Sequence, residues 1–102
     1  MKNYVFGTGA SEDLYDIWDY IAKDSADAAD RWLGKLFDAF DAIAARPGIG
    51  HKREDLIPYD VLLWPVGAYL IVYRTTSGPI EIVTITQGSR NLSALLLRRL
   101  SR

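Results

Sequence analysis

Two β-rich runs dominate the pattern of apolar and polar positions in the second half of the chain. Residues 64–73 and 80–87 are rich in Val, Ile, Tyr and Thr, and the breakers at residues 76–79 separate them. The short Gly-containing connection predicts an antiparallel hairpin. Between residues 68 and 73, the odd and the even positions are both apolar. Because a strand with one wet face alternates apolar with polar residues, this pattern predicts cover on both faces of a sheet.

The first half of the chain has helical periodicity instead. Apolar residues recur at helical spacing between residues 14 and 21 and again between residues 29 and 44. Thr8 is the predicted N-cap of the first helix and Ser25 that of the second, and Arg46-Pro47-Gly48 ends the second. The short connection between the two predicts an αα-hairpin.

The remaining segments complete one domain over residues 1–102. Residues 3–6 and 61–66 are predicted strands, and Asn91 is the predicted N-cap of a short leucine-rich helix. The order strand, helix, helix and three strands predicts an α+β fold: an N-terminal strand and an α-helical hairpin packed on a small antiparallel β-sheet, with a short C-terminal helix. One short helix is too small to hide the second sheet face, so we expect an apolar patch for a partner.

Composition and charge narrow the functional class. The 102 residues contain no Cys, which excludes disulfides and Cys-based zinc sites, and no apolar run reaches the roughly 20 residues of a spanning helix. We expect a soluble cytoplasmic protein without a membrane role. Residues 1–45 hold nine acidic and four basic residues, a net of −5, whereas residues 46–102 hold eight basic and four acidic, a net of +4. This asymmetry is too modest for a stand-alone nucleic-acid binder, so no direct sequence-specific nucleic-acid binding is expected.

Three patterns associated with catalysis or cofactors are incomplete. Gly7-Thr8-Gly9 precedes a predicted helix but lacks the third glycine and the parallel strand of a dinucleotide site. His51 is the only histidine and has no second ligand or triad partner at a diagnostic spacing. Asp13, Asp16 and Asp19 recur on the polar side of the first helix, as expected of a solvated face. We therefore expect no catalytic residue, metal ion or cofactor.

Basic residues of the C-terminal half are the better candidates for function. Two interpretations are equally open: contact with a macromolecular target, or surface solubility and stabilisation of a helix C-terminus. The candidates for target contact are Lys52, Arg53, Arg90, Arg98, Arg99 and Arg102. Trp64, on a strand with two apolar faces, is either a core residue or an interface anchor.

An ordered series of short segments covers nearly the whole chain and resembles one known family. The segments are 13–22, 29–32, Arg46-Pro47 with Gly50, Arg53, Asp55 and Leu56, then 65–67, 69–74, 80–83 and 88–90. Together they resemble a ParE-type toxin of the RelE/ParE toxin–antitoxin superfamily. The resemblance implies a helical hairpin on a small sheet and neutralisation by a co-expressed antitoxin whose C-terminal segment wraps the toxin. ParE relatives poison DNA gyrase, and RelE relatives cut mRNA on the ribosome.

Departures from the family pattern distinguish between these activities. Leu62 stands where relatives often carry Arg, residues 84–87 read Thr-Ile-Thr-Gln instead of Arg-Val-Leu-His, and Asn91 replaces Asp. The segment 91–102 also lacks the tyrosine that handles RNA in ribonuclease relatives. RNA cleavage needs groups that move protons and stabilise charge on the phosphate.

We therefore expect a non-catalytic toxin that binds and poisons DNA gyrase and forms a hetero-oligomer with its antitoxin. The alternatives are a ribosome-dependent endoribonuclease and a degenerate module that binds antitoxin without toxicity. The residues expected to contact the antitoxin are Trp64, Tyr69, Ile71, Tyr73, Leu96 and Leu100.

Overall fold

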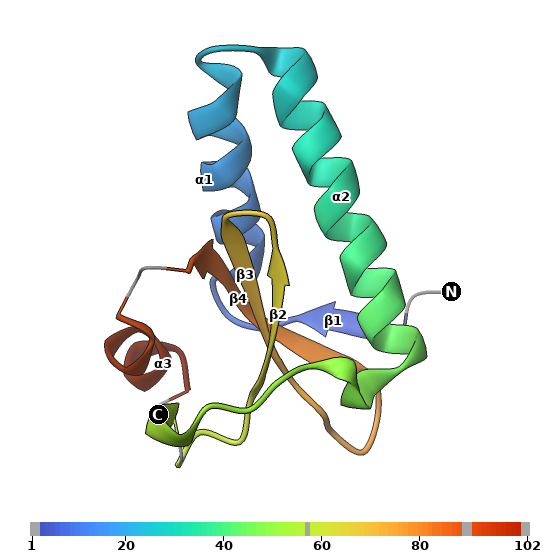
Figure 1. Cartoon of the computed structure of the whole chain (residues 1–102), viewed down its shortest axis with the longest axis vertical. Helices are drawn as coiled ribbons and strands as arrows, with labels where there is room; N and C mark the ends of the chain where they lie inside the picture. The colour runs from blue at the N-terminus through green and yellow to red at the C-terminus, as the bar shows by residue number, and fades with distance from the viewer. Residues whose placement is uncertain (1–2, 57, 89–90, 101–102) are drawn as a thin grey trace.

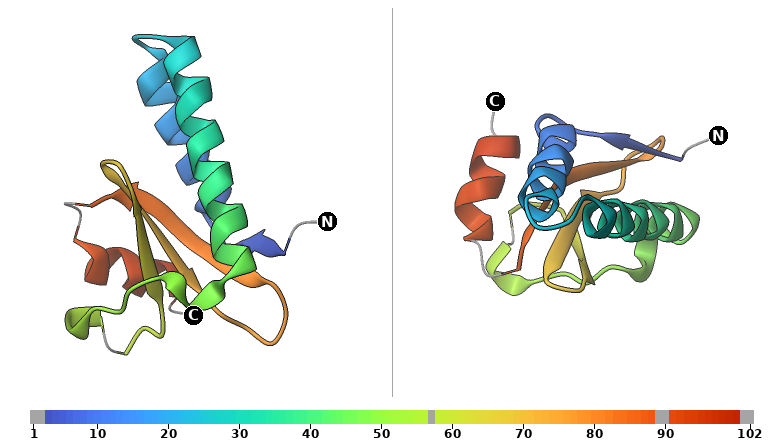
Figure 2. Two further views of the ribbon diagram at one scale, coloured as in Figure 1. Left: turned by 45° about the vertical axis from the view of Figure 1, so that its right-hand side comes forward. Right: turned by 90° about the horizontal axis from the view of Figure 1, so that it is seen from above.

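The computed structural model describes residues 3–56, 58–88 and 91–100 and has an α+β architecture, as predicted (Figure 1). The elements in chain order are β1 (Tyr4–Phe6), α1 (Ala10–Ala22), α2 (Ala26–Ala45), the 3-10 turns η1 (Pro47–Ile49) and η2 (Glu54–Leu56), β2 (Leu62–Val66), β3 (Tyr69–Arg74), β4 (Ile80–Gln87) and α3 (Leu92–Leu100). Helices α1 and α2 form the predicted hairpin, whose connecting end projects well beyond the sheet (Figures 1 and 2).

The sheet has the strand order β1-β4-β3-β2. Strands β2, β3 and β4 are antiparallel, as the sequence pattern predicts, but β1 pairs in parallel with β4, so that the whole sheet is mixed. The register of β1 reaches only from Ile80 to Ile82 of β4. Among the described residues, no strand therefore lies beside the second half of β4 on that side.

A β-bulge in β4 changes which residues face each side of the sheet. Val72 pairs with Thr84, whereas the next residue of β3, Tyr73, pairs with Ile82, which leaves Val83 as the extra residue. Ile82 packs in the core beside the helical hairpin, and Val83 packs in the core on the opposite face. The bulge therefore aims the side chain of Thr84 away from the face that Ile82 occupies.

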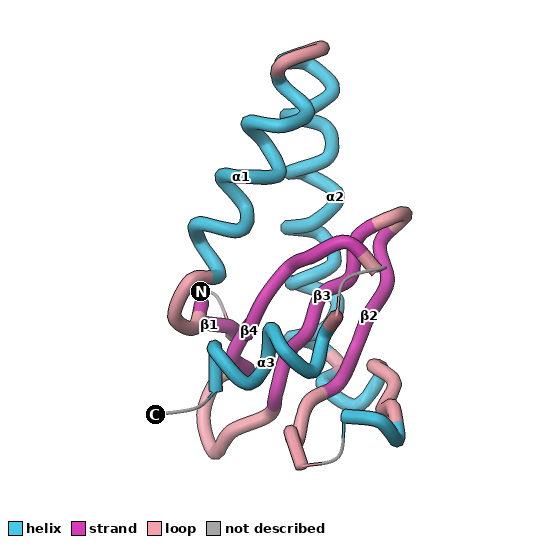
Figure 3. Tube along the Cα trace, turned by 90° about the vertical axis from the view of Figure 1, so that its left-hand side faces the viewer, coloured by secondary structure: helices cyan, strands magenta, loops and turns pink. Residues whose placement is uncertain are grey.

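Both sheet faces are covered by the chain itself. On one face, Leu36, Phe40 and Ile43 of α2 are fully buried in a core that they share with residues of β1, β3 and β4. On the other face, α3 contributes buried leucines, including Leu92 and Leu96, which pack with residues of η2, β2, β3 and β4 (Figure 3). The prediction of an exposed apolar patch on this face is therefore wrong, because η2 and the segment after it cover the sheet together with α3.

Helix ends follow local capping chemistry with one exception. The Ser25 hydroxyl accepts a hydrogen bond from the Ala28 N–H at 3.1 Å, and Asn91 Oδ1 accepts one from the Ala94 N–H at 3.2 Å, so both predicted caps are confirmed. The prediction for Thr8 is wrong, because Gly9 occupies the cap position of α1 with φ of 86°. Only glycine adopts this conformation without strain.

Candidate protein-interaction site

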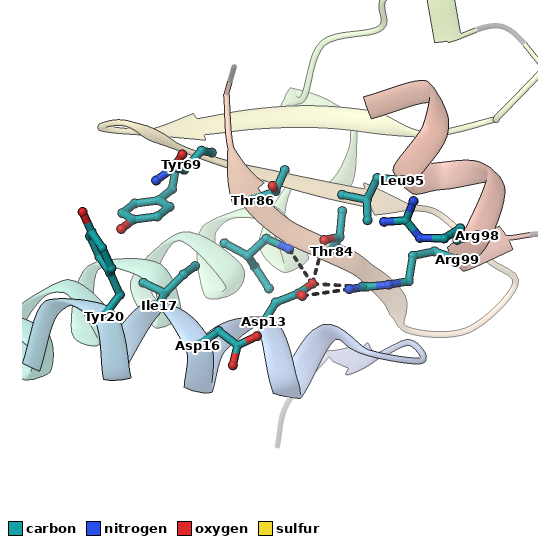
Figure 4. A pocket seen from close by; sticks show the side chains of 12 residues that line it. Asp13, Asp16, Ile17, Tyr20, Tyr69, Thr84, Thr86, Leu95, Arg98 and Arg99 are labelled. Atoms are coloured by element: carbon teal, nitrogen blue, oxygen red, sulfur yellow. Dashed lines mark hydrogen bonds and ion pairs between the residues drawn. The ribbon is translucent and has the colours of Figure 1, made fainter. Parts of the chain in front are cut away.

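A cavity of about 400 Å³ lies along the unpaired half of β4, between α1 and α3 (Figure 4). We call it the edge cavity; its walls are Asp16, Ile17 and Tyr20 of α1, Tyr69 of β3, residues 84–87 of β4, and Leu95 and Arg98 of α3. Asp13 and Arg99 also line it (Figure 4). The cavity exists because β1 ends before the second half of β4, and the chain leaves β1 to form α1.

Asp13 and Arg99 form a tight ion pair that joins three elements. Asp13 Oδ1 accepts a hydrogen bond from Arg99 Nη2 at 2.8 Å, and its Oδ2 accepts one from Arg99 Nη1 at 2.9 Å. The same Oδ2 accepts hydrogen bonds from the Thr84 hydroxyl at 2.6 Å and the Ile85 N–H at 3.3 Å. Arg99 Nη1 also donates to the Val83 carbonyl at 3.1 Å. The pair thus ties α3 to both α1 and β4.

The two side chains of this pair are largely shielded from solvent. The Arg99 and Asp13 side chains are only 19% and 16% exposed. The hydrogen bonds with Asp13 raise the pKa of Arg99 although burial opposes the charge. Two expectations are corrected here: Asp13 does not belong to a solvated helix face, and Arg99 is occupied within the chain instead of free for a target.

The predicted basic loop lies elsewhere and is partly neutralised by its own acids. Arg53 donates from Nε and Nη2 to the two Asp55 oxygens at 3.0 and 2.6 Å, and Lys52 lies 3.4 Å from an Asp60 oxygen. The hydrogen bond with Arg53 lowers the pKa of Asp55. Lys52 and Arg53 remain exposed, so the loop still presents cationic side chains.

The other predicted basic residues divide into two groups. Arg98 is exposed and lines the edge cavity. Arg90 and Arg102 lie outside the described residues. The sequence pattern gave Arg98 and Arg99 the same expected role. In the structure, Arg98 is exposed, whereas Arg99 is paired with Asp13.

The six residues expected to contact an antitoxin also divide. Ile71, Tyr73 and Leu96 are fully buried and therefore not accessible to a partner in this structure. The expectation that these three residues contact the antitoxin is corrected. Their burial follows from the cover that the two helical layers give to the sheet. Trp64, Tyr69 and Leu100 remain partly exposed. Tyr69 lines the edge cavity, and burial raises the pKa of its hydroxyl.

The partly exposed Trp64 lies at the opposite edge of the sheet, on β2. The ring of His51 stacks on it with 6.1 Å between centroids. The backbone of His51 also forms an isolated antiparallel bridge with Leu63. The single histidine of the sequence is therefore separated from the edge cavity by β3.

The helical hairpin carries a second, apolar groove, which the sequence pattern did not predict. It has a volume of about 340 Å³ and is lined by Leu14, Tyr15, Trp18, Leu33 and Phe37. Tyr15 is 64% exposed, and the Trp18 indole N–H donates to Asp30 at 2.9 Å. Trp18 belongs to the apolar stripe between residues 14 and 21 but is only partly buried, because helical spacing does not distinguish the middle of a buried stripe from its edge.

The described residues contain neither a metal-binding cluster nor a membrane-spanning helix. Within residues 3–56, 58–88 and 91–100, no group of three or more His, Asp or Glu side chains is placed to hold a metal ion. No helix in the same part of the chain combines the length and apolarity needed to cross a bilayer.

Comparison with known proteins identifies the family. A solved structure from the chromosomal ParDE toxin–antitoxin system of P. aeruginosa has the same fold, with a TM-score of 0.70 and 20% sequence identity over 85% of this chain and 96% of that chain. A search of curated protein sequences gives no match. The family described as ParE toxin of type II toxin–antitoxin system, parDE, matches residues 4–92. The chain therefore belongs to the ParE family of type II toxins, and the resemblance seen in its sequence is confirmed.

Proposed function

We propose that this type II toxin acts by binding and poisoning DNA gyrase without catalysis of its own, and that a cognate antitoxin encoded beside it neutralises it. The observation that carries the proposal is the family match over residues 4–92. Gyrase as the target is what membership of the ParE branch implies.

The chemistry of the edge cavity supports binding over catalysis. A general acid or base must be able to gain or lose a proton at the reacting group. The Asp13 carboxylate of this cavity already accepts hydrogen bonds from Arg99, Thr84 and Ile85, and the only histidine lies across the sheet. The ribonuclease alternative requires proton-transfer groups, and these two candidates are poorly placed for it.

A supercoiling assay tests the proposal. Purified chain is added to gyrase, ATP and relaxed plasmid; we expect loss of supercoiling and accumulation of linear DNA. No effect at micromolar excess contradicts gyrase poisoning. Codon-phased mRNA ends after induced expression instead support the endoribonuclease, and normal growth after induction without antitoxin supports the degenerate module.

Two lysines form a matched pair that tests the basic loop as the target contact. The side chains of Lys52 and Lys23 are each 72% exposed, and each lies within 4.0 Å of an aspartate oxygen. We expect Lys52→Glu to weaken gyrase inhibition several-fold, most strongly at low salt, because screening reduces long-range attraction. Lys23→Glu carries the same charge change on the helical hairpin and should leave inhibition unchanged. Equal effects of both variants argue for a general charge effect.

The hairpin groove supports an antitoxin contact. An apolar groove on a surface helix pair fits the apolar face of an amphipathic helix. This groove contains the exposed ring of Tyr15 and lies on the acidic half of the chain. Tyr15→Glu should weaken antitoxin binding, measured by calorimetry, whereas Leu97→Glu, at an exposed apolar residue of α3 that lines neither this groove nor the edge cavity, serves as the comparison.

A further inference from the structure

The outer edge of β2 is closed to strand pairing, so a partner at this edge must be bound by side chains. The Leu63 N–H and carbonyl each bond to the backbone of His51 at 2.8 Å. Pro65, which faces the same side two residues later, has no N–H to donate. Unpaired edges are templates for an additional strand, and these two features remove that template from β2.

Two stacked aromatic rings lie at this edge. The His51 ring stacks on the Trp64 ring with 6.1 Å between the centroids and 15° between the planes. His51 is exposed, and Trp64 is partly exposed although it also packs against the core beside the helical hairpin. Because the bridge to Leu63 holds His51 and the core holds Trp64, little freedom is lost when a partner covers the pair. Tryptophan is also among the residues most enriched at the energetic centre of protein interfaces.

A cavity continues this edge on the other side of His51 in the chain. It has a volume of about 320 Å³ and is lined by residues 52–54 and 58–61. Tyr59 is partly exposed there, and Lys52 and Arg53 bring positive charge. Aromatic residues and arginine are enriched in the central part of protein interfaces. The aromatic pair and the cavity therefore form a continuous surface with the composition of a protein-binding site.

The charges of this edge favour a protein partner over DNA. Residues 51–60 hold two cationic and three acidic residues, a net of −1 with the histidine neutral. Lys52 Nζ lies 3.4 Å from an oxygen of Asp60, whose side chain is 91% exposed, and Arg53 is paired with the exposed Asp55. A phosphate that approached either cation would therefore also approach a carboxylate. A protein surface can instead present charges of both signs to these pairs.

We propose that this edge of β2 is a protein-binding surface of the toxin and that its partner is the protein part of DNA gyrase. We call it the β2-edge surface; it consists of Trp64, His51, Lys52, Arg53, Tyr59 and Asp60. The inference rests on the proposed gyrase poisoning and gives it a contact that does not depend on the DNA. It also assigns Trp64 to the target instead of the antitoxin.

Removal of the aromatic pair tests the proposal by direct binding to purified gyrase, measured with and without plasmid DNA. His51→Ala removes the stacked ring and leaves the backbone bridge in place. Trp64→Leu removes the second ring and keeps an apolar residue on β2. We expect His51→Ala to weaken gyrase binding about fivefold and Trp64→Leu to weaken it at least about tenfold, with DNA and without it. Circular dichroism checks folding, and His51→Ala alone decides the test if Trp64→Leu is unfolded.

Lys35→Ala is the matched control, because it removes a polar side chain from a comparable ring contact on the helical hairpin. The Lys35 ammonium lies 4.8 Å from the ring centroid of Trp32, which is also partly exposed. We expect this control to change gyrase binding less than about twofold. The β2-edge surface shares no residue with the hairpin groove, so His51→Ala should leave antitoxin binding unchanged.

The outcomes separate the inference from the proposed function. Tight gyrase binding by the unmodified chain without an effect of either aromatic variant would overturn the inference while gyrase poisoning stands. Binding that requires DNA and weakens steeply with salt would identify DNA as the partner and also overturn it. Weaker antitoxin binding by His51→Ala would identify the antitoxin as the occupant, with the same consequence. If the unmodified chain neither binds nor inhibits gyrase, the proposed function itself is wrong.

Discussion

Replacing Arg99 with methionine removes the charge that holds α3 against the rest of the molecule. The methionine keeps most of the apolar stem, so the main change is the loss of the guanidinium. Asp13 would then keep only the Thr84 hydroxyl and the Ile85 N–H as donors. A carboxylate that is only 16% exposed would thus lose its counter-ion. We expect the variant to be folded but clearly less stable.

The magnitude follows from the burial of the pair. Breaking a fully buried ion pair by removing one partner costs about 3–5 kcal/mol. Since the Arg99 and Asp13 side chains are 19% and 16% exposed, some solvent screening remains, and we expect about 2–3 kcal/mol. For a domain of this size, that loss lowers the Tm by roughly 10–20 °C.

Urea unfolding followed by tryptophan fluorescence measures the free energy of unfolding. Arg98→Met is the matched control, because Arg98 is the adjacent arginine of the same helix and is exposed. We expect the control to change stability by less than about 0.5 kcal/mol. In a double-mutant cycle, Asp13→Asn combined with Arg99→Met should recover part of the loss, because no unpaired charge remains buried. Equal stability of Arg99→Met and Arg98→Met would refute the assignment of Asp13–Arg99 as a structural ion pair.

Two more positions give sharp expectations. The buried Tyr73 hydroxyl donates to the Pro47 carbonyl at 2.7 Å and accepts from the Gly50 N–H at 2.9 Å, so Tyr73→Phe should cost about 1–3 kcal/mol in urea unfolding. Burial raises the pKa of Tyr73 above its ordinary value of 10.0. The contribution of the neutral hydroxyl to the free energy of unfolding should therefore be complete below pH 10 and should fall as the pH rises through the folded-state pKa. Tyr73→Phe should lack this pH-dependent loss of stability in alkaline unfolding. Gly67→Ala should lower stability by about 1–3 kcal/mol, because φ is 59° and the added Cβ would collide with the Trp32 ring; unchanged thermal unfolding would contradict this reading of the β2–β3 turn.

The elements with strong local signals were predictable from the sequence. Helical spacing identified α1 and α2, and the caps Ser25 and Asn91 were found because a capping side chain acts within three residues of its own position. The β3–β4 hairpin was found because its breakers lie between two runs of β-branched residues. Each of these features depends on neighbours along the chain.

The features that shape the edge cavity depend on distant neighbours, so the sequence did not reveal them. Asp13 and Asp16 occupy equivalent positions in the helical pattern. What distinguishes them is the tertiary contact of Asp13 with Arg99, which lies 86 residues later in the chain. The bulge at Val83 does change the alternation, because apolar residues at positions 80 and 82 are followed by threonines at 84 and 86. A strand that is covered on both faces has no fixed alternation, so this change did not stand out as a shift of face. The parallel pairing of β1 with β4 brings together the first and the last strand of the chain, and no turn between them determines it.

The closed edge of β2 has a consequence for the protein at high concentration. Copies that join edge to edge through their sheets can grow into a filament only if each copy offers a donor edge and an acceptor edge. The backbone bridge from His51 and the missing amide hydrogen of Pro65 withdraw β2 from that role. The β2 edge of one copy therefore cannot pair with the open β4 edge of the next copy in a repeating, head-to-tail manner. This protects the toxin from fibrous aggregation by that route, although one strand edge is unpaired.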